Sequence, residues 1–283
     1  MKYDLTCVLG PTASGKTKYA VAMAKEMGAE ILSADSRQVY CGMDIGTGKD
    51  LDDYDGVPYH LIDIVPAGEK YDIHRYQKDF RIAYQDIISR GKPAILCGGS
   101  GLYIEAATRD YHLPEVPPNF ELRAELERDS DDALIARLAS LKQLHNSTDF
   151  DTRKRLIRAL EIALYEREHN LERSDFKPLN THYIGIDVSR EERNARIDLR
   201  LDARLKEGLV EEVQALLDSG ISAENLIYYG LEYKFVTLNI TGHLSYEDMR
   251  NQLATAIHQF AKRQMTWFRG MERRGIMIEW VKV

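Results

Sequence analysis

The chain has 283 residues, of which 44% are hydrophobic and 29% are charged, with 19 glycines and 8 prolines. This length suits one large domain or a core with a modest insertion, and the composition excludes a disordered chain because it supplies enough apolar side chains for a core. The formal net charge of -7 excludes nucleic-acid binding through the overall field, so any RNA contact must come from local basic patches.

The cysteines and the hydropathy pattern indicate a cellular compartment. Cys7, Cys41 and Cys97 are scattered, without CxxC or His-spaced ligand patterns, so we expect neither a disulfide framework nor structural zinc. No segment approaches the roughly 20 apolar residues of a membrane span. We therefore expect a cytoplasmic protein that does not contact membranes. A monomer is a separate expectation, which these features do not test.

Strands and helices alternate in the first part of the chain. The pattern predicts a strand at 5–9, a helix at 16–27, a strand at 30–33, a helix at 71–90 and a strand at 94–97. A strand, a crossover helix and a second strand of these lengths form a right-handed βαβ unit, and hence a parallel sheet covered by helices. The predicted fold class is α/β, with a parallel sheet like that of P-loop NTPases.

A helical insertion follows. Pro114, Pro117 and Pro118 interrupt any regular element, and the next segment predicts only helices, at 121–128, 131–141 and 150–168. We therefore expect a small all-helical domain, 113–179, inserted in a core domain made of 1–112 and 180–283. After the insertion the pattern predicts a strand at 183–187, one long helix with apolar positions from 197 to 216, a helix at 246–269 and a strand at 276–281.

Residues 10–17, GPTASGKT, match a phosphate-binding loop, and they follow a predicted strand and precede a predicted helix. In such a loop, backbone N–H groups and the helix N-terminus attract phosphate, Lys16 adds positive charge and Thr17 offers a hydroxyl to Mg²⁺. A structural glycine turn is the alternative. The predicted diphosphate or nucleotide site consists of Gly10, Pro11, Thr12, Ala13, Ser14, Gly15, Lys16 and Thr17.

Asp35 follows the second predicted strand, at the sheet edge where open α/β folds bind ligands. A carboxylate there can accept a proton from an attacking nucleophile. An aspartate that caps a turn explains the position equally well. Asp63 ends an apolar run and leaves a similar choice between a Mg²⁺-associated carboxylate and a cap, whereas no pair of the eight histidines has a metal-ligand spacing.

Seven motifs, in family order from about residue 8 to residue 269, resemble those of the tRNA dimethylallyltransferases, also called tRNA isopentenyltransferases. The motifs are GPTASGKT at 10–17, DSRQVY at 35–40, MDIGTGK at 43–49, HLID at 60–63, GGSGLY at 98–103, RLIRALE at 155–161 and AKRQMTWFR at 261–269. The resemblance implies a strand at 60–63. It also implies transfer of a dimethylallyl group from dimethylallyl diphosphate to N6 of adenosine 37, with Mg²⁺, in tRNAs that read codons beginning with U.

The resemblance assigns roles as well. Asp35 becomes the general base, Lys16 and Thr17 hold the diphosphate and Mg²⁺, and Arg196 clamps phosphate, with Arg200 as a weaker candidate. The alternative for both arginines is a solvated helix face, because Glu191, Glu192, Asp198 and Asp202 are interleaved with them at salt-bridge spacing. The implied contacts with the anticodon stem-loop of tRNA are Asp35, Ser36, Arg37, Gln38, Ser100, Arg123, Lys154, Arg155, Leu156, Ile157 and Arg158.

Two basic clusters offer local RNA-binding surface. One comprises Arg153, Lys154, Arg155 and Arg158, and the other comprises Lys262, Arg263, Arg269, Arg273 and Arg274. Four aromatic residues, Tyr40, Tyr103, Trp267 and Phe268, either stack on bases or fill the core.

The sequence departs from the family pattern at three short segments, and its insertion between Pro118 and Arg153 is also shorter than that pattern. Ser100 replaces the usual threonine, and residues 228–232 (YYGLE) and 257–260 (IHQF) differ from the usual segments. Three other functions stay open: a P-loop kinase that binds ATP and a small metabolite, an adenylate isopentenyltransferase that acts on free nucleotide, and a catalytically silent RNA-binding relative. The kinase leaves the last motif and the basic clusters unexplained.

Overall fold

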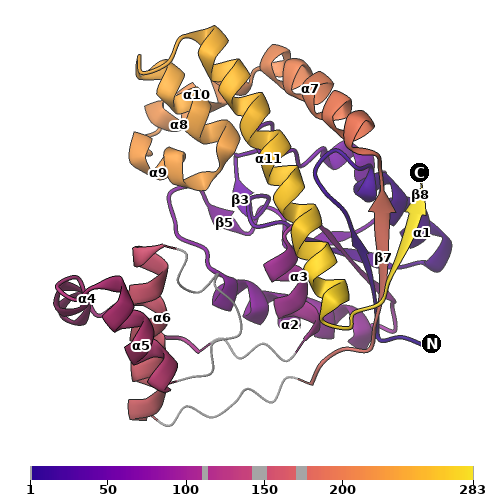
Figure 1. Cartoon of the computed structure of the whole chain (residues 1–283). Helices are drawn as coiled ribbons and strands as arrows, with labels where there is room; N and C mark the ends of the chain where they lie inside the picture. Colours follow the sequence, from indigo (N-terminus) through magenta and orange to yellow (C-terminus); the bar gives the residue numbers. More distant parts are fainter. Residues whose placement is uncertain (1, 110–113, 142–151, 170–176, 283) are drawn as a thin grey trace. The chain divides into compact units, whose positions relative to one another are not determined.

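The structure, a computed structural model, describes residues 2–109, 114–141, 152–169 and 177–282. The chain forms two compact units, one made of Met1–Asp110 with Lys177–Val283 and the other of Tyr111–Phe176. Figure 1 shows the elements of both. In the described residues, no helix is long and apolar enough to cross a membrane.

The larger unit is built on a six-stranded sheet. Its strands are β1 (Leu5–Leu9), β2 (Glu30–Ala34), β4 (Tyr59–His60), β6 (Ala94–Gly98), β7 (Thr181–Asp187) and β8 (Ile278–Lys282), in the order β4-β2-β6-β1-β7-β8. Every pairing is parallel. Two short strands, β3 (Tyr40–Cys41) and β5 (Val65–Pro66), pair separately. Because parallel strands end at one edge, the segments after β1, β2 and β6 lie together there.

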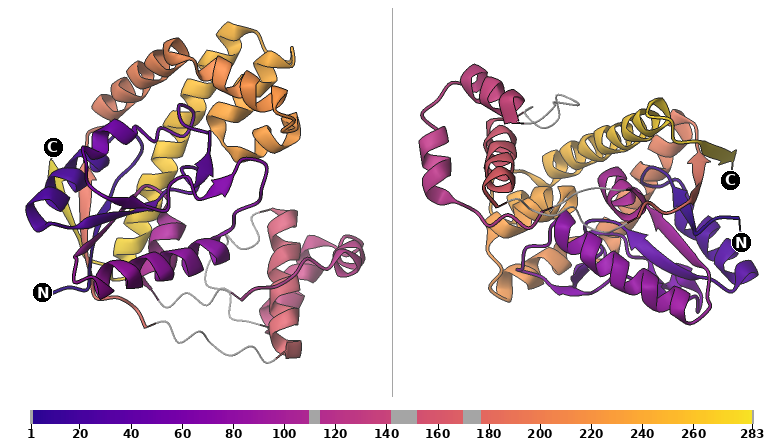
Figure 2. Two further views of the ribbon diagram at one scale, coloured as in Figure 1. Left: turned by 180° about the vertical axis from the view of Figure 1, so that it is seen from behind. Right: turned by 90° about the horizontal axis from the view of Figure 1, so that it is seen from below.

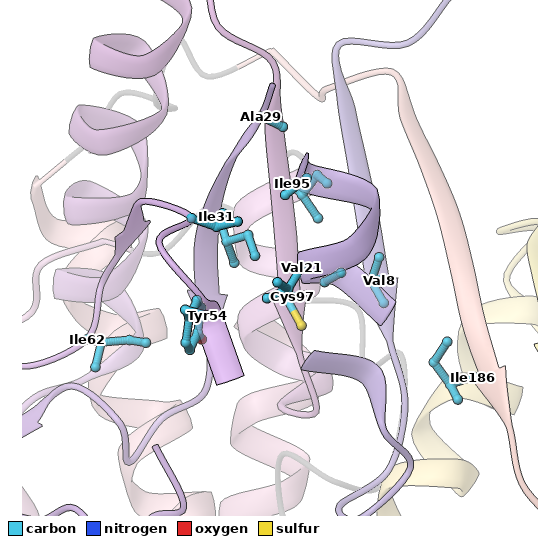
Figure 3. Packing of buried hydrophobic residues seen from close by; sticks show 12 residues of the cluster. Val8, Val21, Ala29, Ile31, Tyr54, Ile62, Ile95, Cys97 and Ile186 are labelled. Atoms are coloured by element: carbon cyan, nitrogen blue, oxygen red, sulfur yellow. The ribbon is translucent and has the colours of Figure 1, made fainter. Parts of the chain in front are cut away.

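Both faces of this sheet are buried, which explains the apolar runs of its strands. On one face, Ile31 and Ile95 pack with Val21 of α1 (Lys16–Met27) and with Tyr54 of the 3₁₀ turn η1 (Leu51–Tyr54) (Figure 3). The adjacent residues Leu32 and Leu96 point to the other face and are fully buried. Helices α2 (Ile73–Ser89) and α3 (Gly101–Thr108) also contact the strands.

Five helices complete the larger unit: α7 (Arg190–Glu207), α8 (Leu209–Asp218), α9 (Ala223–Tyr229), α10 (Leu231–Ile240) and α11 (Tyr246–Arg273). Helix α10 packs against α8, α9 and α11 (Figure 2). The single helix predicted from 197 to 216 is wrong. Gly208, at φ 108°, ends α7 in the left-handed conformation that glycine favours, and α8 begins at the next residue.

The smaller unit contains, in its described residues, only helices: α4 (Phe120–Leu126), α5 (Asp131–Leu141) and α6 (Arg153–His169). The first residues of the helix predicted at 150–168 lie outside the described part of the chain. Side chains of all three helices form its core, including Leu126, Leu134, Leu138 and Leu160. The amphipathic pattern of these segments is therefore satisfied within the unit.

The phosphate-loop α/β fold and the remaining predicted strands and helices are confirmed, with ends shifted by a few residues. The strand expected at 60–63 is wrong beyond His60, because Leu61 and Asp63 have positive φ angles of 66° and 54° and turn the chain.

Candidate active site

The loop between β1 and α1 has the tight backbone of a phosphate site. Ala13 and Gly15 have φ angles of 60° and 86°, and the Ser14 N–H donates to the Pro11 carbonyl at 3.3 Å. The Lys16 ammonium donates to the same carbonyl at 3.4 Å, so it folds back over the loop. Desolvation lowers the pKa of Lys16. Burial removes water from this ammonium and so disfavours its charged form. A bound anion would favour the charged form again.

Three arginines of α7 recur at four-residue spacing, and the first two contact this loop. Arg196 donates to the Ser14 carbonyl at 3.4 Å, Arg200 donates to the Thr12 hydroxyl, and Arg204 lies 3.5 Å from the Asp50 carboxylate. Burial and the neighbouring Arg204 lower the pKa of Arg200 to about 10, so it stays cationic at neutral pH. The structure therefore brings both candidate arginines, Arg196 and Arg200, to the predicted phosphate site.

The alternative for these arginines, a solvated helix face with interleaved acidic residues, describes only part of α7. Glu192 pairs with Arg196 at 2.6 Å, as the spacing suggests. Asp198 and Asp202, in contrast, pair with α11, at 2.9 Å from His258 and 2.8 Å from Arg250. Asp198 and Asp202 therefore link α7 to α11, whereas Arg196 contacts both Glu192 and the loop.

Asp35 lies directly after β2, at the carboxyl edge of the sheet. Its Oδ1 accepts the Arg37 N–H at 2.9 Å, so the turn-capping interpretation holds for this oxygen. Its Oδ2 accepts no hydrogen bond from the part of the chain that the structure describes. The carboxylate also acts electrostatically on Lys16 and Arg200, raising the pKa of each against the desolvation that lowers it. Asp35 thus interacts electrostatically with Lys16 and Arg200 and has one oxygen available.

Ser100 and Gln38 fix the segment that carries Asp35. The Ser36 N–H donates to the Ser100 hydroxyl at 3.3 Å, which ties this segment to the turn after β6. Gln38 accepts from the Ser33 hydroxyl at 3.1 Å and donates to the Gly48 carbonyl at 3.0 Å. The contact uses the Ser100 hydroxyl. The threonine of the family pattern also has a hydroxyl, so the replacement keeps the interacting group.

Gln264 of α11 joins the two halves of the site. Its side-chain carbonyl accepts the Thr12 N–H at 2.8 Å, and its amide donates to the Gly99 carbonyl at 3.0 Å. The side chain is buried, with the residue 7% exposed. A Cβ at Gly99 would clash with the Gln264 amide nitrogen, so a side chain at that position would displace the bridge. The sequence placed Gln264 within a motif but gave no indication of this bridge.

Residues 43–49 are held by contacts that the sequence did not reveal. The Glu212 carboxylate of α8 accepts the N–H groups of residues 44, 45 and 46 at 2.8, 2.7 and 3.0 Å and the Tyr233 hydroxyl at 2.7 Å. Lys49, 2% exposed, donates to the Tyr40 carbonyl at 2.7 Å and pairs with Asp44 and Asp63. Asp63 therefore has an ammonium partner within this loop.

The aromatic residues that were candidates for base stacking fill the core or its edge. They are Tyr40, Tyr103, Trp267 and Phe268. Tyr40 and Phe268 are fully buried and Tyr103 is 8% exposed, while the Trp267 indole donates to Glu105 at 2.9 Å. The core alternative is confirmed for Tyr40, Tyr103 and Phe268.

The candidate RNA contacts of the helical unit fall into three groups: paired, buried and exposed residues. Arg123 and Arg158 both bind the buried Glu161 carboxylate. Leu156 and Ile157 are 1% and 3% exposed because they fill the core of the unit, so their side chains are not part of its exposed surface. Lys154 and Arg155 are exposed.

The basic clusters keep exposed charge on both units. In the first cluster, Arg153 pairs with Glu127 at 2.7 Å and with Asp131. In the second, Arg274 pairs with Glu105 at 2.7 Å. All five members of the second cluster are exposed: Lys262, Arg263, Arg269, Arg273 and Arg274.

Comparison with known proteins decides the family. A family profile described as IPP transferase matches residues 38–271. The chain belongs to the IPP transferase family. A second profile, isopentenyl transferase, matches residues 3–54. A tRNA dimethylallyltransferase from Porphyromonas gingivalis is 58% identical over 278 residues, which cover 97% of this chain and 92% of the relative. One from Bacteroides fragilis is 55% identical over 283 residues, or 99% of this chain and 92% of the relative.

Solved structures of the IPP transferase family have the same fold. The tRNA isopentenylpyrophosphate transferase of Bacillus halodurans superimposes with a TM-score of 0.73 at 32% identity, covering 99% of this chain and 90% of the other. A eukaryotic dimethylallyltransferase acting on tRNA gives a TM-score of 0.80 at 23% identity over 98% of this chain and 73% of the other, a likeness of fold.

Proposed function

We propose that this IPP transferase moves a dimethylallyl group from dimethylallyl diphosphate to N6 of adenosine 37 in tRNAs that read codons beginning with U. The observation that carries the proposal is the convergence of a phosphate loop, its cations and Asp35 at one sheet edge. The names of the relatives that share most of the chain support tRNA as the acceptor.

The donor diphosphate binds at residues 10–17. As the bond between the dimethylallyl carbon and the diphosphate oxygen breaks, its electron pair stays on the oxygen and negative charge grows there. Lys16, Arg196 and Arg200 are directed at this loop and stabilise that charge. Thr12 is held by Gln264 through its N–H and by Arg200 through its hydroxyl, so its position is fixed before the substrate binds.

The residues fit a Mg²⁺ ion that binds together with the substrate. Within the described residues no group of three or more His, Cys, Asp or Glu side chains could hold a metal ion. Mg²⁺ commonly takes one or two protein ligands and completes its shell with phosphate oxygens and water. Thr17, at the start of α1, would hold the ion, which would further neutralise the leaving diphosphate.

The acceptor amine reacts beside Asp35. As the N6 nitrogen forms its bond to the dimethylallyl carbon, Asp35 Oδ2 takes the proton that nitrogen loses. Arg37 keeps the carboxylate oriented through Oδ1, and Ser100 holds the same segment through Ser36. A general base of this kind contributes about 10²- to 10⁴-fold to a rate.

Exposed basic side chains bind the tRNA backbone. Lys154 and Arg155 on the helical unit, and the C-terminal cluster on the larger unit, supply local positive charge on an acidic protein. We propose that Arg123 and Arg158, although paired with Glu161, also face the anticodon stem. The protein would act in the cytoplasm as a monomer.

Acceptor choice is the decisive test, because the isopentenyl transferase match at residues 3–54 leaves a free-nucleotide acceptor as the second candidate. Purified protein, Mg²⁺ and labelled dimethylallyl diphosphate are incubated with unmodified A37 tRNA, the same tRNA with G37, AMP or ATP. We expect label only in the A37 tRNA. Label in AMP supports the second candidate, and conversion of ATP to ADP without label transfer supports a kinase. No product with any acceptor contradicts both prenyl-transfer assignments.

A further inference from the structure

The side chain of Arg37, two residues after Asp35, places its guanidinium over the face of an exposed aromatic ring. The ring belongs to Tyr228 of α9, which is 59% exposed. The Arg37 guanidinium carbon lies 5.7 Å from the centre of its ring, a cation–π contact. Tyr228 has no role in the site described above.

The next residue fixes the position of this ring. Tyr229 is 2% exposed, and its hydroxyl accepts the Gly68 N–H at 2.8 Å and donates to the Glu69 carbonyl at 2.9 Å. Its ring packs on Tyr40 with centroids 4.6 Å apart. Helix α9 is thereby anchored beside β3 and β5 (Figures 1 and 2). The exposed ring of Tyr228 is consequently held on a rigid base.

Arg37 links this ring to the proposed reaction centre. Its backbone N–H binds Asp35 Oδ1 at 2.9 Å, and its side chain reaches Tyr228. A Cβ built on Gly230 would lie 3.8 Å from Arg37 Nε, so the end of α9 also packs on this arginine. The Arg37–Tyr228 pair therefore includes a residue only two positions from the carboxylate that receives the acceptor's proton.

We propose that the Arg37–Tyr228 pair is a stacking platform for a nucleobase adjacent to the reacting adenosine. Aromatic rings and planar guanidinium groups bind the faces of unpaired bases, and the arginine charge also suits an RNA strand. Asp35 would engage the reacting base, while the platform holds its neighbour. The inference rests on the proposed function, because it requires an RNA acceptor.

Three variants test the platform with an A37 anticodon stem-loop that carries 2-aminopurine at position 36 or 38. Tyr228→Leu removes the ring, Tyr228→Phe keeps it, and Tyr246→Leu removes a control tyrosine that is 54% exposed at the start of α11. We expect Tyr228→Leu to lower kcat/KM for the stem-loop by about 5- to 150-fold, with an unchanged dissociation constant for dimethylallyl diphosphate. Tyr228→Phe and Tyr246→Leu should both keep the wild-type kcat/KM.

The fluorescence of 2-aminopurine separates stacking from a structural effect. The wild type and Tyr228→Phe should quench the probe at one of the two positions on binding, and Tyr228→Leu should not. Wild-type kcat/KM and quenching in Tyr228→Leu would overturn the platform while leaving the proposed function intact. If the wild type transfers no label to the stem-loop or to tRNA, the proposed function itself fails.

Discussion

Replacing Gln264 by leucine tests whether its bridge stabilises the site. Leucine has a similar volume, so the main loss is of two hydrogen bonds, to the Thr12 N–H at 2.8 Å and the Gly99 carbonyl at 3.0 Å. An unsatisfied buried polar group costs about 1–3 kcal/mol. Gly99 is buried and Thr12 is half-buried. We therefore expect Gln264→Leu to lower the free energy of unfolding by about 2–4 kcal/mol.

Urea unfolding followed by circular dichroism measures this change. Gln259→Leu is the matched control, since Gln259 is an exposed glutamine on the same helix, and its effect should stay within about 0.5 kcal/mol. Thr12 loses one of its two anchors in Gln264→Leu, so the KM for dimethylallyl diphosphate should also rise. A variant with wild-type stability and wild-type KM would refute the reasoning.

Two further predictions address charge. Lys16→Ala should weaken binding of dimethylallyl diphosphate, measured by calorimetry, with unchanged affinity for tRNA; an unchanged diphosphate affinity would mean that this loop is not the donor site. The guanidinium of Arg90, with His60, holds the pKa of the Glu30 carboxyl at about 2, below its usual value of 4.5. The stability from this carboxylate is thus present above pH 4.5 and is lost as the pH falls toward 2. In thermal unfolding between about pH 3 and 7, Glu30→Gln should destabilise the protein at neutral pH and flatten the acid limb; the wild-type pH profile in the variant would contradict this.

Local pattern predicted the elements that build the site. Glycines bracket the phosphate loop, and apolar runs mark β1, β2 and β6, so both the loop and Asp35 could be placed at one sheet edge. The two-residue strands β3, β4 and β5 carry too little periodicity to be recognised. The helix break at Gly208 was missed because the apolar spacing continues through it.

Long-range contacts could not be predicted in the same way. Glu212 binds backbone N–H groups more than 160 residues earlier in the chain, and backbone groups have no sequence signal. Gln264 likewise bridges two backbone groups, of Thr12 and Gly99, whose proximity arises only once the sheet has formed. Burial of Leu156 and Ile157 was hidden because a family motif mixes core and surface residues.

The most direct test of the account compares single-turnover transfer to A37 tRNA in the wild type and in Asp35→Asn. Asparagine keeps the side-chain oxygen that accepts the Arg37 N–H at 2.9 Å, so the turn is preserved and only the base is lost. We expect the transfer rate to fall by about 10²-fold or more, with unchanged dissociation constants for dimethylallyl diphosphate and tRNA. A rate near that of the wild type would contradict the assignment of Asp35 as the general base.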